Sequence, residues 1–248
     1  MNSVEKDVFS VDLGRVRDDS VSKLVDGVVH QLEMTIAVGL LAGGERLPTE
    51  AELAGKLQVS TVTLRQALTV LRDRGLIETR RGRGGGSYVR DFGTADRERA
   101  DAQLRTTSAE KLRDLGDLVG ALTGAATRLA ALRALPEDVD RLEDLARNFA
   151  EATRADVRRR ADSRFHIELG AAAQSSHLTT LIVQAQAQVA PLLWDTDALD
   201  PHDAIREHAL IVEAIRDRDP DAAHRHALEH CARETRVLVD RHLALAAT

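Results

Sequence analysis

Four side chains in the second half of the chain could hold one metal ion together. Asp162 and His166 are four residues apart, so a helix would place both on one face. His208 and His230 lie in two further segments with helical patterns. Three imidazoles and one carboxylate would suit Zn²⁺, Ni²⁺ or Mn²⁺. Spacing alone does not show that these segments converge, and among nine histidines ordinary surface or core side chains are the alternative.

A second set of candidate residues lies on a helix predicted to begin after Ser60. Apolar residues recur there at three- and four-residue spacing and form an inward stripe: Leu64, Ala67, Leu68 and Leu71. The other face carries hydroxyl and guanidinium donors: Thr61, Arg65, Thr69 and Arg72. An arginine on such a face can reach a guanine edge or a phosphate, and hydroxyls suit phosphate oxygens. The alternative is an ordinary solvated helix face.

The elements around this helix follow the order helix, turn, helix, hairpin. Thr49 and Glu52 have capping-box spacing and start a short helix that ends near Leu57. Ser60 is a good N-cap for the second helix, which runs to about residue 74, and Gly75 can end it. Residues 76–80 and 87–90 read as two strands joined by a glycine-rich basic turn, which could also be a floppy exposed loop.

Positive charge is concentrated on the same segment. Residues 56–90 hold eight basic and two acidic side chains, in a chain whose net charge is −6. Phosphate contact should therefore be local and should weaken with added salt. The predicted DNA-binding residues are Ser60, Thr61, Thr63, Arg65, Arg81, Gly82 and Arg83.

This segment resembles the N-terminal domain of the GntR family of bacterial transcription regulators. The matching positions are Leu47-Pro48, Glu50, Leu53-Ala54, Val59-Ser60, Leu64-Arg65, Ala67-Leu68, Leu71, Gly75 and Gly82-Arg83-Gly84. Thr61 stands where the family often has arginine, and Ala51 where it often has a basic residue. We therefore expect recognition to depend more on Arg65 and on the two arginines of the hairpin.

Composition favours two soluble domains. The 248 residues are 43% hydrophobic and 30% charged, no apolar run approaches membrane-spanning length, and residues 1–20 do not read as a signal segment. We expect a cytoplasmic protein with no membrane association. Cys231 is the one cysteine, which excludes an internal disulfide and favours a small buried side chain over a redox switch.

The expected fold is mainly α, with a winged helix-turn-helix followed by an all-helical bundle. We expect a mobile tail over 1–20, the winged domain over 21–93 with a first helix from Val21 to about Ala42, and a partly helical linker over 94–107. Residues 108–248 lack a strand pattern, and their prolines are expected to separate six or seven helices. After residue 90 there are 21 basic and 28 acidic side chains, so this domain is not expected to hold DNA.

The helical domain resembles the C-terminal ligand-binding domain of the FadR subfamily of GntR regulators. Its metal-binding members show Asp-x-x-x-His, then a histidine after a glutamate, then a last histidine one helix later. Asp162, His166, Glu207-His208 and His230 match this order. The resemblance implies a divalent transition metal, zinc first with nickel or manganese as alternatives, in a cavity where it helps to bind a small carboxylate. The histidines outside the pattern are expected on the surface: His177, His202, His224 and His226.

The effector region departs from the family. Val119 and Thr123 stand where members often carry arginine and glutamate, and Ser175 where they often carry asparagine. The usual anion clamp is therefore expected to be missing. Candidate effector-binding residues are Ser175, Gln184, Gln188 and Trp194, together with Gln186. A polar helix face with one packed aromatic side chain is the alternative.

The combined reading is a homodimeric, metal-containing repressor of transcription that binds a palindromic operator in double-stranded DNA. A small metabolite, in the first place an organic acid, would control its affinity for DNA. The alternatives are a metal sensor without an organic effector, a purely structural ion, and a metal-dependent hydrolase. A hydrolase would need a base-bearing motif such as HExxH, which the sequence lacks, so we do not expect an enzyme.

Overall fold

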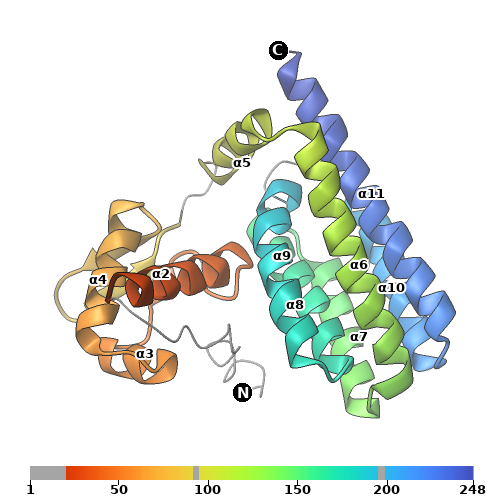
Figure 1. Ribbon diagram of the computed structural model, residues 1–248, viewed down its shortest axis with the longest axis horizontal. Helices are drawn as coiled ribbons and strands as arrows, with labels where there is room; N and C mark the ends of the chain where they lie inside the picture. The colour runs from red at the N-terminus through yellow and green to blue at the C-terminus, as the bar shows by residue number, and fades with distance from the viewer. Residues whose placement is uncertain (1–20, 92–94, 195–198, 248) are drawn as a thin grey trace. The chain divides into compact units, whose positions relative to one another are not determined.

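The computed structural model describes residues 21–91, 95–194 and 199–247. The chain divides into two compact units at residue 94. Among the described residues the structure is helical apart from one two-stranded hairpin (Figure 1). The mainly α fold expected from the sequence is confirmed.

The first unit is a winged helix-turn-helix. Its elements are α2 (Val21–Ala37), α3 (Glu50–Leu57), α4 (Thr61–Asp73), β1 (Ile77–Arg80) and β2 (Gly86–Val89). Leu32 of α2, Leu53 of α3 and Leu64 of α4 are fully buried in its core. Helix α2 ends at Ala37, five residues before the expected end, and the chain turns at Gly39 with a φ of 70°.

The starts of α3 and α4 are set by local caps. The Thr49 hydroxyl accepts a hydrogen bond from the Glu52 backbone N–H, and the Glu52 carboxylate accepts one from Thr49. Ser60 accepts from the backbone N–H of Thr63 at 3.0 Å. Each cap satisfies backbone donors that a helix start leaves free, so both predicted helices begin where these residues stand.

The wing is an ordered hairpin. Its antiparallel register pairs Ile77 with Val89 and Arg80 with Gly86. The turn between the strands is closed by a hydrogen bond from Gly85 N–H to Gly82 O, 2.8 Å, and Gly82 has a φ of 98° that favours glycine. These bonds argue against a floppy loop and hold the turn at the tip of the hairpin.

The second unit is a helical bundle. It contains α5 (Ala95–Thr106), α6 (Ala109–Arg133), α7 (Pro136–Glu151), α8 (Ala155–Ala172), α9 (Ser176–Trp194), α10 (Pro201–Arg216) and α11 (Pro220–Ala246). Pro136, Pro201 and Pro220 stand in the first turns of their helices, where a missing N–H costs nothing. Pro191 differs from the expectation, because it lies inside α9 and does not end it.

Helix α5 occupies most of the segment expected to be a linker. It packs against α9 and α11 of the bundle. Ala100 and Leu104 are buried, and Asp101 forms an ion pair with Arg241 of α11 at 2.9 Å. The segment has a polar sequence because, among its described side chains, Ala100 and Leu104 are the buried apolar ones and they lie one turn apart.

Helices α6 and α11 lie side by side along the bundle (Figure 1). Gly116, Gly120 and Gly124 of α6 face α11, and an added Cβ at these positions would meet Thr235, Cys231 and His224. Small residues at four-residue spacing thus let the two backbones approach closely. By length and composition α6 is the one described helix that could cross a membrane, and 44% of its apolar window is buried in the bundle.

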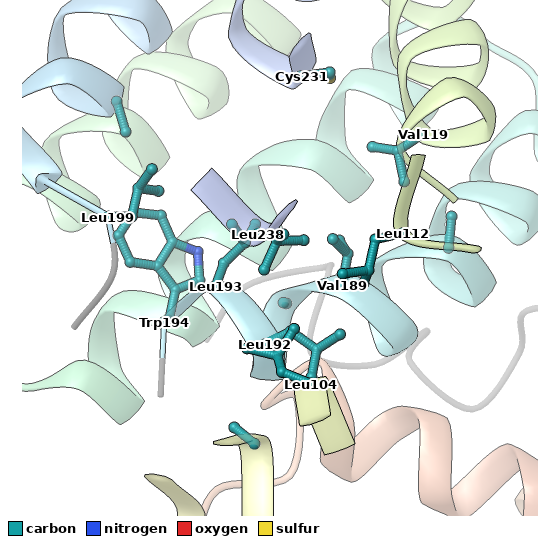
Figure 2. Packing of buried hydrophobic residues seen from close by; sticks show 14 of the residues in the cluster. Leu104, Leu112, Val119, Val189, Leu192, Leu193, Trp194, Leu199, Cys231 and Leu238 are labelled. Carbon is teal, nitrogen blue, oxygen red and sulfur yellow. The ribbon is translucent and has the colours of Figure 1, made fainter. Parts of the chain in front are cut away.

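Two apolar clusters form the bundle core. One contains Trp194 at the end of α9, Leu238 of α11 and Leu112 of α6, which Figure 2 shows packed with their neighbours. The other surrounds Phe165 and Leu169 of α8. Together the clusters fix α8, α10 and α11, the three helices that carry the candidate metal ligands.

Candidate metal centre and nucleic-acid interface

The four predicted metal ligands converge inside the bundle. Asp162 and His166 come from α8, His208 from α10 and His230 from α11. One ligand atom from each lies within 4.8 Å of the others. The histidines are 0% exposed and the aspartate 1%. The packing of α8, α10 and α11 therefore brings together residues that the sequence separates by 68 positions.

The spacing of the donor atoms suits a single ion. Nε2 of His230 lies 3.3 Å from Nε2 of His166. Asp162 Oδ1 lies 3.5 Å from Nε2 of His208 and 3.9 Å from Nε2 of His166. Two ligands bound at about 2.0–2.2 Å to one ion are separated by about 3–4 Å, so small adjustments suffice to enclose it.

Unsatisfied polar atoms at the centre also fit a metal. No hydrogen bond of standard geometry reaches either carboxylate oxygen of Asp162 or either ring nitrogen of His208. Buried polar atoms are normally hydrogen-bonded because desolvation without a partner is costly. A divalent cation would supply the missing partner to both side chains, and the donor set fits a borderline transition metal.

Glu207 of the neighbouring helix α10 holds His230 in place. Its Oε2 is 2.7 Å from Nδ1 of His230, which directs Nε2 of that ring toward the other ligands. Arg233 donates two hydrogen bonds to the same carboxylate, at 2.6 and 2.5 Å. Although partial burial opposes it, hydrogen bonds from His230 and Arg233 lower the pKa of Glu207 to about 2. The sequence match included Glu207 only as the neighbour of His208, and its contact with His230 is visible only in the structure.

Aromatic rings enclose the imidazole of His208. Phe165 stacks on it with ring centroids 4.1 Å apart, and Phe149 of α7 meets it edge-on at 4.8 Å. Trp194 in turn packs edge-on against Phe149 at 5.1 Å. Rings packed in this way restrict the rotation of His208 and exclude water from the centre.

The electrostatics of the centre favour neutral imidazoles at His166 and His208 and proton retention by His230 and Asp162. Burial lowers the pKa values of His166 and His208 well below their usual value, so both are neutral and able to bind a metal. Burial opposes the charging of His230, but the carboxylates around it raise its pKa. Burial and the neighbouring Glu234 raise the pKa of Asp162 to about 8. A bound cation would replace these protons.

The candidate effector residues are dispersed. Trp194 is buried beside the centre, and Gln184 of α9 is half-buried. Gln188 is exposed, whereas Gln186, which was grouped with it, is 1% exposed with an unpaired Oε1. Ser175 uses its hydroxyl to accept a hydrogen bond from Leu178 at the start of α9.

A pocket of about 270 Å³ lies elsewhere in the bundle, where α7 begins and α10 ends. It is lined by Ala134, Pro136, Val139, Asp140, Ile215, Arg216 and Arg218. None of these is a metal ligand or a candidate effector residue. Of the histidines expected on the surface, His177 and His202 are exposed, while His224 and His226 are half-buried.

In the first unit, α4 presents the expected donors on its exposed face. Ser60, Thr61 and Arg65 are exposed, and Arg65 Nε donates to Glu50 Oε2 of α3 at 2.6 Å. Thr63 differs from the expectation, because it is 5% exposed and its hydroxyl lies 2.8 Å from that of Ser60. Its side chain therefore supports the start of α4 and does not lie on the exposed face.

The wing places its arginines in solvent. Arg81, Gly82 and Arg83 are exposed at the hairpin tip. Arg46 donates a hydrogen bond to Gly85 O at 2.7 Å and supports the turn from beneath. Sequence reasoning missed Arg46, whose part in the wing depends on a contact 39 positions along the chain.

An exposed helix face beside a basic hairpin, joined to a separate helical domain, defines a DNA-binding transcription regulator of the winged-helix class. Residues 24–86 match the family described as "Bacterial regulatory proteins, gntR family", and residues 114–233 match the FCD domain. The chain belongs to the GntR family, in its FadR-type branch with an FCD domain.

Relatives support this assignment. The chain is 40% identical over 224 residues to the putative HTH-type transcriptional regulator RmpR of Mycobacterium gastri, covering 89% of this chain and 82% of that protein. It is 28% identical to the Glc operon transcriptional activator of Escherichia coli K12, covering 86% and 87%. It is 30% identical over 164 residues to a putative L-lactate dehydrogenase operon regulatory protein of the same strain, covering 64% and 61%. These relatives are regulators and not enzymes.

A solved structure shares the fold. The E. coli McbR/YncC structure aligns with a TM-score of 0.53 at 18% identity, covering 88% of this chain and 97% of that one. At this level of identity the likeness concerns the fold alone.

Proposed function

We propose that this regulator contains a divalent transition metal in its FCD domain and that a small ligand bound beside the ion controls DNA binding. This proposal rests on the convergence of Asp162, His166, His208 and His230 inside the helical domain. Zinc is the first candidate, with nickel and manganese as alternatives, because imidazole nitrogens and one carboxylate suit all three.

A small organic acid is the ligand class that this site favours. A bound cation supplies a partner for a carboxylate, and Trp194 and Gln184 lie on the neighbouring helix. The relative named for the L-lactate dehydrogenase operon is in keeping with this class. Buried Val119 and Thr123 on α6 stand where an anion clamp is expected, so direct coordination to the ion would be the main contact of a bound carboxylate.

For DNA we propose a homodimer that reads a palindromic operator and represses transcription in the bacterial cytoplasm. One recognition helix covers only a few base pairs, and a symmetric pair multiplies that energy. The exposed face of α4 would enter the major groove through Ser60, Thr61 and Arg65. The wing would contact the backbone or minor groove through Arg81, Gly82 and Arg83.

Control by a ligand requires only a modest coupling between the domains. A difference of about 1–3 kcal/mol between the ligand's affinities for the DNA-free and DNA-bound forms changes the affinity for DNA by about 5- to 150-fold. Release of the operator on ligand binding is the expected direction. A change in the separation of two recognition helices would be enough to produce it.

The test starts from DNA selected from a random pool by the full-length protein. Operator affinity is then measured by fluorescence anisotropy with metal-loaded protein, with chelated protein, and with a panel of small carboxylates. We expect a carboxylate to weaken operator binding by metal-loaded protein only. Affinity that follows free metal without any carboxylate would indicate a metal sensor, and unfolding on chelation would indicate a structural ion. A panel without effect in every state would contradict control by an organic acid.

A further inference from the structure

Glu234 is a fifth buried side chain at the candidate metal centre. It lies on α11 one turn after His230 and is 3% exposed. Its Oε1 is 3.3 Å from Nε2 of His230 and has no hydrogen-bond partner of standard geometry. The match to the FCD domain ends at residue 233, so the family assignment gives Glu234 no role.

The contact between Glu234 and His230 cannot persist once an ion is bound. Nδ1 of His230 is engaged by Glu207, so Nε2 is the atom that faces the other ligands. A nitrogen that binds a metal has no proton to donate. Oε1 of Glu234 would then be a buried carboxylate oxygen without a partner, which is unfavourable.

The charge of the bound ion indicates what the partner of Glu234 would be. Three neutral imidazoles and Asp162 would leave a divalent ion with one uncompensated positive charge in a buried site. Glu207 cannot neutralise it, because it is already paired with Arg233. The carboxylate of Glu234 would bring the centre to neutrality, so the unpaired anion and the uncompensated cation relieve each other.

We propose that Glu234 is a ligand of the metal ion, which would then have three nitrogen and two oxygen donors. This inference rests on the proposed metal centre. The 3.3 Å between Oε1 and His230 Nε2 is a normal separation for two donors on one ion with bonds of about 2.0–2.2 Å. Five protein donors favour five or six coordination over the tetrahedral sites preferred by structural zinc, and six coordination leaves one position for an external oxygen.

The test uses Co²⁺ as a spectroscopic probe in the full-length protein. Four-coordinate Co²⁺ absorbs visible light several-fold more strongly than five- or six-coordinate Co²⁺. We expect Glu234→Ala and Glu234→Gln to bind Co²⁺ at least ~10-fold more weakly than the unaltered protein and with a changed visible spectrum. Acetate added to Glu234→Ala should move its spectrum back toward that of the unaltered protein, because it can take the vacant position.

Controls separate ligation from a structural role. Glu229→Ala removes an exposed carboxylate from the same helix and should change neither affinity nor spectrum. Far-UV circular dichroism checks folding, and Glu234→Gln, which preserves the side-chain shape, carries the test if the alanine variant unfolds. Glu234 variants whose Co²⁺ spectrum and affinity match the unaltered protein would overturn this inference alone. Failure of the unaltered protein to bind Co²⁺, Zn²⁺, Ni²⁺ or Mn²⁺ would overturn the metal centre itself.

Discussion

Replacing Gly116 by alanine should force α11 away from α6, whereas the same change at Gly120 should be tolerated. A Cβ at Gly116 would overlap Oγ1 and Cγ2 of Thr235 and would lie 2.8 Å from its Cβ. Because all three atoms are too close, no rotation of Thr235 relieves the overlap. A Cβ at Gly120 would meet Cys231 and Leu228 at 3.8 Å, which is ordinary van der Waals contact.

The magnitudes follow from this geometry. Alanine in a helix interior is favoured over glycine by about 1 kcal/mol, so Gly120→Ala should stabilise the bundle by roughly 0.5–1 kcal/mol. Overpacking costs about 1–3 kcal/mol, so after the same helix-propensity gain Gly116→Ala should destabilise the bundle by up to about 2.5 kcal/mol. The two variants should then differ in stability by about 1–3 kcal/mol, and in melting temperature by about 2–12 °C in a domain of this size.

The assay is thermal unfolding followed by circular dichroism in chelator, so that metal binding does not contribute. Thr235→Ala combined with Gly116→Ala should recover part of the loss, since it removes two of the three overlapping atoms. A Gly116→Ala protein as stable as Gly120→Ala would refute the close packing of α6 on α11 described above. It would also argue against the packing of α11 that brings His230 close to the other metal ligands.

Three further predictions concern DNA, metal and pH. Arg65→Ala should weaken operator binding by about 1–3 kcal/mol per site and reduce or abolish base discrimination at one position, measured by anisotropy titration. The control Arg147→Ala also breaks an exposed ion pair and should leave operator affinity unchanged. Glu207→Gln should weaken metal binding about 10- to 100-fold in competition titrations, because it loosens His230; an unchanged affinity would show that this contact does not position the ligand. The metal-induced rise in melting temperature should be larger at pH 8 than at pH 6. The pKa of Asp162 is raised to about 8 and that of His230 is also raised, so bound protons stabilise the metal-free form at low pH and this stabilisation is lost as the pH rises. The affinity for metal increases over the same range, because the ion no longer competes with these protons. A metal-induced increase in melting temperature that is equal or smaller at pH 8 would contradict this prediction.

The winged domain could be predicted closely because its signals are local. The capping residues of α3 and α4, the apolar stripe of α4 and the glycines of the wing each act within a few positions of the chain. Arg46 was missed because its role depends on a contact with Gly85 of the wing. The burial of Thr63 was missed because it depends on the exact rotation of α4.

The helical domain was predictable in class but not in detail. Helix α5 was predicted only as a partly helical linker, because its buried apolar residues Ala100 and Leu104 are outnumbered by charged residues. In α9 the choice between Gln186 and Gln188 depends on the rotation of the helix about its axis, which a weakly amphipathic sequence does not determine.

The metal ligands illustrate the same limit. Only Asp162 and His166 share a helix, so their spacing alone indicates a common site. The approach of His208 and His230 is a consequence of how α10 and α11 pack on α8, and it was expected only from the family resemblance. Glu234 carries no sequence signal beyond lying four residues after His230.

The most direct test of the account is the metal content of the purified full-length protein, measured by elemental analysis without added chelator. We predict about one transition-metal ion per chain, lost in the double variant His208→Ala/His230→Ala. The matched control His177→Ala/His202→Ala removes two exposed histidines and should retain the ion. Equal metal content in both double variants, or none in the unaltered protein, would contradict the proposed metal centre.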